Sequence, residues 1–119
     1  MTAEEIRKRY NVSAAALKIY EDQVRMVSEE NQTKEKDYDD QDLERIGMIM
    51  TLGKMGFPDE EIGIFVRMEK EGEITKGQRL VMLKKQRRHI LDEIHQKEKI
   101  LGELDYLRYE LKGGRSDGI

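Results

Sequence analysis

The feature that most constrains the fold is a repeating apolar pattern in the C-terminal part of the chain. Ten positions between residues 80 and 111 follow each other at alternating spacings of three and four, and seven of them are apolar. The pattern predicts one helix over residues 76–112, roughly 55 Å long at about 1.5 Å per residue. The apolar positions predicted to form a dimer interface are Leu80, Leu83, Ile90, Ile94, Leu101, Leu104 and Leu111.

A helix of this length cannot bury its apolar stripe against a domain of about 70 residues, so it needs a partner helix. The simplest partner is a second copy of the same chain. The three polar members of the stripe, Arg87, Lys97 and Arg108, are expected to set register and orientation. Gly102 costs about 1 kcal/mol relative to Ala in a helix, which favours a bend or a close contact there.

Composition supports an α-rich chain and excludes several classes. Of the 119 residues, 37% are hydrophobic and 39% are charged, which suits amphipathic helices with one buried face each. The absence of cysteine excludes disulfides, Cys-based zinc sites and Cys nucleophiles. No apolar run approaches the roughly 20 residues of a membrane-spanning helix, and the N-terminus lacks the apolar region of a signal peptide. We therefore expect a cytoplasmic protein without membrane partners.

The N-terminal residues predict two short helices joined by a turn. The first runs from Ala3 to about Arg9, and Thr2 and Glu5 have the spacing of a capping box at its start. The second begins after Ser13, runs to about Asp22, and turns Leu17 inward together with Tyr20 or Ile19. Two short helices separated by about four residues form a helix-turn-helix arrangement.

The next segments predict a wing and two further helices. Residues 27–37 are polar and aperiodic, and are expected to form a loop or a small β-hairpin wing. Asp39 caps a helix that ends at Gly56, and Pro58 starts another that ends at Gly72. The methionines are expected to fill the small core, with a Met-lined ligand pocket as the less favoured alternative. The other predicted core residues are Leu17, Ile46, Ile49, Phe57, Ile62 and Phe65.

These patterns divide the chain into three parts: a winged helix-turn-helix domain (1–72), a linker with the long helix (73–112), and a flexible tail (113–119). Charge is divided unevenly between them. Residues 1–72 hold 11 basic and 17 acidic residues, a net −6, whereas residues 73–119 hold 11 and 8, a net +3. Because a DNA-binding domain usually carries a basic footprint, this balance weighs against strong DNA binding.

Three stretches follow recognisable motifs. VSAAALKIYED follows the pattern Val-Ser-x-x-Thr-Leu-Arg-Tyr-Tyr-Glu, with Lys18 in place of Arg. YDDQDLERI resembles the entry to a third helix, and LGKMGFPDEEI resembles a Gly-Phe-Ser-x-x-Glu-Ile signature. The matching positions are Val12, Ser13, Leu17, Tyr20, Glu21, Tyr38, Asp42, Leu43, Ile46, Gly56, Phe57, Glu61 and Ile62. In this order, and followed by a long helix, they resemble the MerR family of bacterial transcription regulators.

The resemblance implies an all-α fold that leaves room for a small β wing. It also implies a homodimer joined by an antiparallel coiled coil, which binds and distorts double-stranded promoter DNA and has RNA polymerase as a candidate partner. The DNA-binding residues that it implies are Ala15, Lys18, Tyr20, Lys34, Lys36, Tyr38 and Arg45. Two simpler interpretations remain open: Tyr20 is a core residue, and Lys18 is merely solvated.

The chain also departs from the family pattern. Ala15 and Ala16 replace the polar residues usual there, the wing reads KEKDY, and we expect no ligand-binding domain after the long helix. The alternative function is therefore a degenerate dimer with little DNA affinity that acts through protein contacts.

Catalytic and metal chemistry is not expected. His89 and His95 are six residues apart, about 600° of helix rotation, and so do not form a chelating pair on one face. No Ser/His/acid set or paired catalytic carboxylates stand out. We expect no enzyme activity, no metal and no cofactor.

Overall fold

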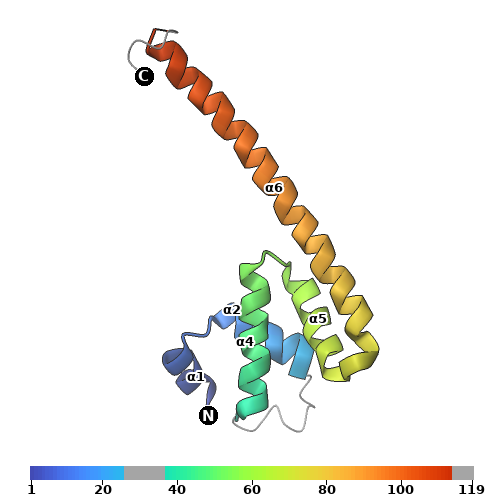
Figure 1. Cartoon of the computed structure of the whole chain (residues 1–119). Coiled ribbons are helices and arrows are strands. Elements are labelled where there is room, and N and C mark those ends of the chain that lie inside the picture. The colour runs from blue at the N-terminus through green and yellow to red at the C-terminus, as the bar shows by residue number, and fades with distance from the viewer. Residues whose placement is uncertain (26–36, 114–119) are drawn as a thin grey trace. The chain divides into compact units, whose positions relative to one another are not determined.

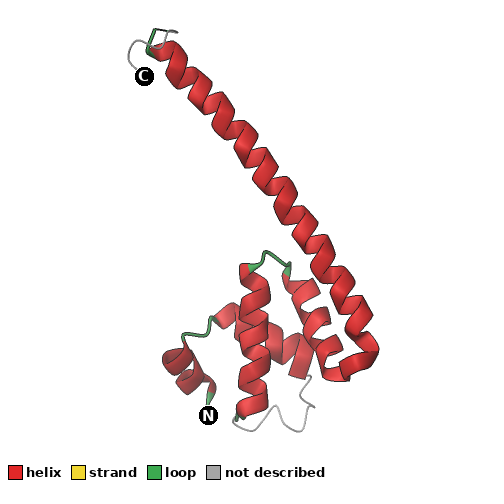
Figure 2. Ribbon diagram, in the orientation of Figure 1, coloured by secondary structure: helices red, strands yellow, loops and turns green. Residues whose placement is uncertain are grey.

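The computed structural model describes residues 1–25 and 37–113, and its regular elements are all helices (Figures 1 and 2). Residues 27–36 of the predicted wing (27–37) lie outside the described residues, and so do its two lysines, Lys34 and Lys36. The chain forms two compact units, Met1–Leu83 and Lys84–Ile119. The first unit therefore extends past the predicted boundary at residue 72 and includes the start of the long helix.

The first two helices begin where their capping residues predict. Helix α1 spans Ala3–Tyr10, and Thr2 and Glu5 form the expected capping box. Asn11 then adopts a left-handed conformation with φ of 54°, which lets the chain turn. Helix α2 spans Ala14–Ile19, and the Ser13 hydroxyl accepts a hydrogen bond from the Ala16 amide at 3.0 Å.

The second helix does not end near Asp22, as predicted, but continues as a π-helical turn, η1, over Tyr20–Arg25. Two basic side chains of a later helix meet the carbonyls at its end. Arg67 donates to the Gln23 carbonyl at 2.6 Å, and Lys70 donates to the Val24 carbonyl at 3.3 Å. Cations at a helix C-terminus are favourable, so these distant residues supply partners that the local sequence lacks.

Two longer helices complete the helical core of the first unit. Helix α4 spans Asp40–Lys54, and Asp39 caps its first turn. It ends at Gly56, as predicted, where φ is 89° and the Phe57 amide donates to the Leu52 carbonyl at 3.2 Å. Together with a bond from the Gly56 amide to the Gly53 carbonyl, this forms a Schellman motif. Helix α5 spans Asp59–Glu71, directly after Pro58.

The core lies among α1, α2, η1, α4 and α5, and all six predicted core residues are buried in it. The expectation for the methionines was wrong. Met48, Met50 and Met82 only border the core, and Met55 is 41% exposed. The inward positions of α4 are taken by Ile46, Ile49 and Leu52, so the flexible methionines are left at its margin.

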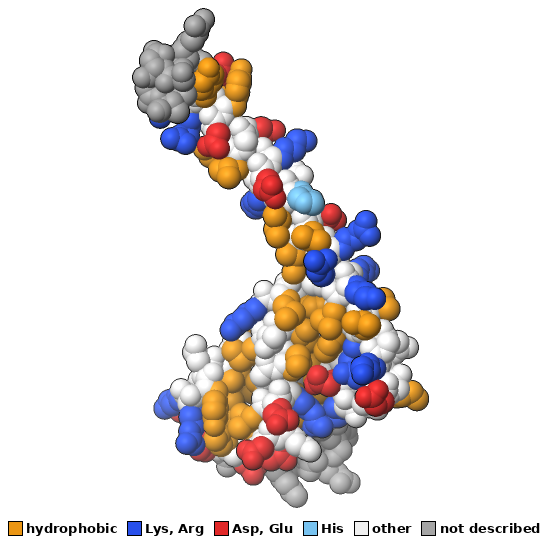
Figure 3. Space-filling model, in the orientation of Figure 1, with side chains coloured by type: hydrophobic (Ala, Val, Ile, Leu, Met, Phe, Trp, Pro, Cys, Tyr) orange, Lys and Arg blue, Asp and Glu red, His pale blue; other side chains and the backbone are white. Residues whose placement is uncertain are grey.

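A 3-10 turn, η2 (Gly72–Thr75), leads into helix α6, which spans Lys76–Leu111. Thr75 is buried, and its hydroxyl donates to the Met68 carbonyl at 2.5 Å. Arg79 donates to the Gly72 carbonyl at 2.7 Å. Met82 also packs against the core. These interactions hold the first residues of α6 within the first unit. No residue of α6 is buried, and apolar side chains appear between charged ones along it (Figure 3).

Candidate nucleic-acid interface

One face of α2 is open to solvent and carries two of the predicted DNA contacts. Ala14 and Ala15 are exposed, and the side chain of Lys18 is 81% exposed. The Lys18 ammonium lies 4.0 Å from the nearer Asp22 carboxylate oxygen, a loose pair at the surface. The structure thus brings Ala15 and Lys18 together on one accessible face.

The opposite face of α2 anchors it to the core. Ala16, Leu17, Ile19 and Tyr20 are all buried. The third alanine of the motif is therefore a packing residue and is not part of the expected methyl surface, which consists of Ala14 and Ala15 alone.

Tyr20 is a core residue, which was the simpler of its two interpretations, and not an exposed DNA contact. It is 1% exposed, and its hydroxyl donates a hydrogen bond to Asp42. Asp42 also accepts from the Asp39 amide at 2.8 Å, so one carboxylate joins the end of α2 to the capping box of α4. Burial, and then the bond to Asp42, raise the pKa of Tyr20 to about 12. Tyr20 therefore positions α2 and presents no surface to a DNA groove.

Tyr38 is buried as well, beside a salt bridge. Its hydroxyl donates to Glu21 at 2.7 Å, and the Arg25 guanidinium lies 4.8 Å from its ring centroid. Arg25 also pairs with Glu21 at 3.2 Å and donates to the Asp37 carbonyl at 2.7 Å. Burial, followed by the bond to Glu21, raises the pKa of the Tyr38 phenol. This cluster ties η1 to the chain that enters α4.

The N-terminal amine secures the same segment. It lies 2.8 Å from the Asp37 carboxylate and donates to the Tyr38 carbonyl at 2.9 Å. The hydrogen bond with this amine lowers the pKa of Asp37. The sequence did not predict that Glu21, Arg25 and Asp42 would be partners of the two tyrosines. The i, i+4 spacing of Glu21 and Arg25 was the one local signal, and it indicates only the salt bridge between those two residues.

Arg45 lies next to the buried network, not on the open face of α2. It is partly buried, and its side-chain hydrogen bond to Tyr20, followed by its charge, opposes the rise in that phenol's pKa. It also contributes to lowering the pKa of Asp39, after the larger effect of the Asp42 amide. Of the predicted DNA contacts in the described residues, Ala15 and Lys18 are accessible, whereas Tyr20 and Tyr38 are buried.

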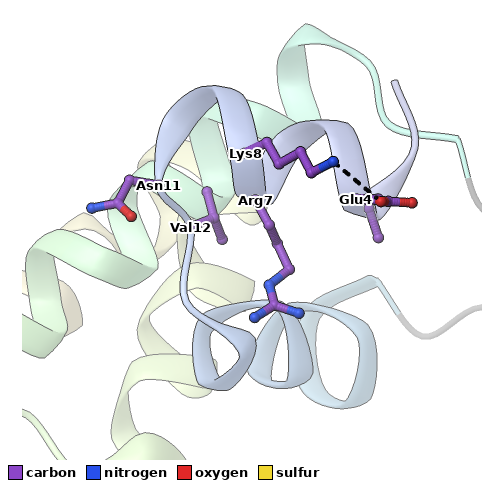
Figure 4. A pocket seen from close by; sticks show the side chains of 6 residues that line it. Glu4, Arg7, Lys8, Asn11 and Val12 are labelled. Carbon is purple, nitrogen blue, oxygen red and sulfur yellow. Dashed lines mark ion pairs between the residues drawn. The ribbon is translucent and has the colours of Figure 1, made fainter.

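A second group of basic residues lies on α1. Arg7, Lys8 and Arg9 are exposed, and Lys8 pairs with Glu4 at 3.4 Å (Figure 4). A surface hollow of about 440 Å³ opens beside them. It is lined by Ala3, Glu4, Arg7, Lys8, Asn11 and Val12. Arg7 and Lys8 extend from this helix in different directions, and only Lys8 is drawn in an ion pair with Glu4 (Figure 4).

The two histidines of the chain lie on α6, in the second unit. His89 pairs with Glu93 at 3.4 Å, on the surface of α6. Across residues 1–25 and 37–113, no three His, Cys, Asp or Glu side chains gather as metal ligands would. Likewise, none of the described helices combines the length and the apolar character that crossing a bilayer requires. The residues predicted for the dimer interface remain uncovered, from 37% exposed at Ile90 to 89% at Leu111.

Comparison with known protein families agrees with this geometry. The family model described as MerR HTH family regulatory protein matches residues 1–69, which include α1, α2, η1, α4 and most of α5. Neither the curated proteins nor the solved structures contain a match. A helix-turn-helix of this family indicates DNA binding in transcription regulation, and its regulators are generally not enzymes. The match covers more than half of the 119 residues, and the chain belongs to the MerR HTH family of regulatory proteins.

Proposed function

We propose that this protein is a homodimeric transcription regulator that binds promoter DNA and distorts it. The observation that carries the proposal is the open face of α2, where Ala14, Ala15 and Lys18 stand free of the core within a MerR-type helix-turn-helix. A helix presented in this way can enter a major groove, as recognition helices do. A promoter-bound dimer would then act on RNA polymerase.

The chemistry of this face predicts weak direct reading of base sequence. Ala14 and Ala15 offer methyl groups, which can contact a thymine methyl but cannot accept or donate hydrogen bonds. Lys18, and Arg7 on α1, would meet phosphates, which position a protein without reading sequence. Selectivity would therefore depend mainly on how easily a promoter bends and untwists.

A second candidate function follows from the charge of the N-terminal region. Residues 1–72 carry a net −6, and Lys8 and Lys18 each lie near a carboxylate four positions away in the chain. Such a surface attracts polyanions poorly. The alternative is a dimer with little DNA affinity that acts through protein contacts.

Salt-dependent binding to duplex DNA from the protein's own upstream region separates the two functions. In the proposed dimer, Lys18→Glu removes one phosphate contact from each copy. The slope of log affinity against log salt should then fall by about two. Fluorescence anisotropy over a salt series measures this slope. Lys99→Glu is the matched control, because Lys99 is exposed and lies in the other unit, and it should leave the slope near that of the parent.

Two outcomes would contradict the proposal. One is that the parent protein shows no salt-sensitive binding at micromolar concentration and low salt, which would favour the protein-contact function. The other is that both lysine variants reduce the slope equally, which would mean that net charge matters but the α2 face does not.

A further inference from the structure

The stripe of ten positions along α6 is symmetric about the point between His95 and Gln96. Leu80 precedes this point by the same number of residues as Leu111 follows it, and the same holds for every other member. The symmetric pairs are Leu80 with Leu111, Leu83 with Arg108, Arg87 with Leu104, Ile90 with Leu101, and Ile94 with Lys97. In heptad terms, each pair joins an a position to a d position, the combination that faces across an antiparallel pair of helices.

The family resemblance implies that α6 pairs with a second, antiparallel copy of itself, and we infer that this pair is centred between His95 and Gln96. The inference rests on the homodimer in the proposed function and adds its register. Ile90 of one copy then packs against Leu101 of the other, and Arg87 lies opposite Leu104. Every stripe position has a partner, and each of the three cations faces an apolar residue.

Charge disfavours the parallel arrangement. In a parallel pair with no stagger, each residue faces its own counterpart, so Arg87, Lys97 and Arg108 would form three layers of like charge. Like charges brought together at a helix interface repel and lose hydration. The centred antiparallel pair avoids all three layers.

Charge and pairing also disfavour the neighbouring antiparallel registers. A centre at residue 92 would set Arg87 against Lys97 and leave Arg108 and Leu111 unpaired. A centre at residue 99 would leave Leu80 and Leu83 unpaired and bring the flanking Glu98 against its own counterpart. In the inferred register, Lys84, which directly follows the stripe residue Leu83, faces Asp105 of the second copy. This is an attractive pair of opposite charges.

The surface of the single helix is consistent with this centre. A shallow hollow of about 370 Å³ runs along α6 from Ile90 to Leu101, and its midpoint coincides with the symmetry point. Ile90, Ile94 and Leu101 supply its apolar lining and are 37%, 47% and 57% exposed. Glu93, Lys97 and Glu98 border it. An apolar floor with charged edges is the surface that a second amphipathic helix covers.

Disulfide crosslinking tests the register directly, because the chain has no cysteine of its own. An Ile90→Cys chain and a size-tagged Leu101→Cys chain are refolded together and oxidised. The expected product is the mixed crosslinked dimer on a non-reducing gel. Each variant oxidised alone should stay uncrosslinked, since its two cysteines would be roughly 16 Å apart along the axis, beyond the reach of a disulfide.

Other crosslinks would overturn the inference, each by identifying a different arrangement. Self-crosslinking of Ile90→Cys would indicate parallel helices. A crosslink between Ile90→Cys and Ile94→Cys chains would indicate an antiparallel pair centred at residue 92. A crosslink between Ile90→Cys and Arg108→Cys chains would indicate one centred at residue 99. No product from any pair, with a monomer in sedimentation, would exclude the dimer. DNA binding by the parent protein is measured separately, so the proposed function and the register can fail independently.

Discussion

At the scale of single residues, burial decides what the two tyrosines of the helix-turn-helix do. Tyr20 and Tyr38 lie with their rings 6.4 Å apart, and each hydroxyl donates to a carboxylate on another segment. Tyr20 reaches Asp42, 22 positions away, and Tyr38 reaches Glu21, 17 positions away. Each bond fixes part of the frame that presents the α2 face.

The Tyr20 phenol should make stability fall at alkaline pH. Its pKa is raised to about 12 in the folded protein, against about 10 for an unfolded tyrosine. The stability linked to this difference is fully present below pH 10 and is lost as pH rises through 12, because the unfolded state releases its proton first. Urea unfolding at pH 7 and pH 11 should show this loss in the parent, and a smaller loss in Tyr20→Phe.

The same variant should lose about 1–3 kcal/mol at pH 7, since the buried Asp42 carboxylate would lack one of its donors. Tyr106→Phe is the matched control, because Tyr106 is 59% exposed on α6. It should change neither the stability at pH 7 nor the alkaline loss. Equal alkaline losses in the parent and in Tyr20→Phe would contradict the role given to this phenol.

At the scale of elements, the position of α2 and η1 depends on how closely α5 can approach. Gly63 lies on the buried face of α5, and a Cβ atom built there would lie 2.9 Å from the Gln23 Cβ and 2.0 Å from its side-chain oxygen. The same helix supplies Arg67 and Lys70, which cap the end of η1. Close packing and capping therefore act together to hold the π-helical turn against α5.

Two glycine substitutions should shift stability in opposite directions. Gly63→Ala should destabilise the fold by about 1–3 kcal/mol, because the added methyl group overpacks the contact with Gln23. Gly47→Ala should stabilise it by up to about 1 kcal/mol, since Gly47 lies inside α4 with open space around it. Denaturant unfolding measures both. A Gly63→Ala variant as stable as the parent, or more stable, would show that the contact between α5 and η1 tolerates a larger residue.

At the scale of the whole molecule, the two compact units differ in what they leave uncovered. The first unit buries the core, whereas the described residues of the second present apolar side chains such as Ile90, Ile94, Leu101 and Leu104 to solvent. Apolar residues repeated at heptad spacing over this length are stable when another helix covers them. A second copy of the chain is the partner that we expect.

Replacing Leu101 and Leu104 together with Glu should abolish the dimer. In the inferred register these residues pack against Ile90 and Arg87 of the second copy, so the change removes four interface leucines from one dimer and sets two carboxylates against Ile90. Analytical sedimentation should give monomers, or an unfolded second unit by circular dichroism. Tyr106→Glu is the control, because Tyr106 lies outside the stripe and should leave the dimer intact. An unchanged dimer mass for the double variant would remove α6 as the interface.

The local sequence by itself determined most helix boundaries, because the interactions that set them join neighbours in the chain. Thr2 with Glu5, and Ser13 with Ala16, are three residues apart, and both pairs formed as the capping pattern predicts. Gly56 likewise ends α4 through bonds within one turn. The spacing along residues 76–112 predicted a single long helix for the same reason.

Only the tertiary structure decided which side chains of the recognition segment face outward. Ala14, Ala15 and Ala16 are alike in sequence, yet Ala16 alone is buried. Tyr20 fits either a groove contact or the core until its distance from Asp42, 22 positions away, is known. The π-helical turn depends on Arg67, which lies 44 positions from the carbonyl it meets. Such contacts depend on how separate helices pack, which neither local spacing nor local capping chemistry specifies.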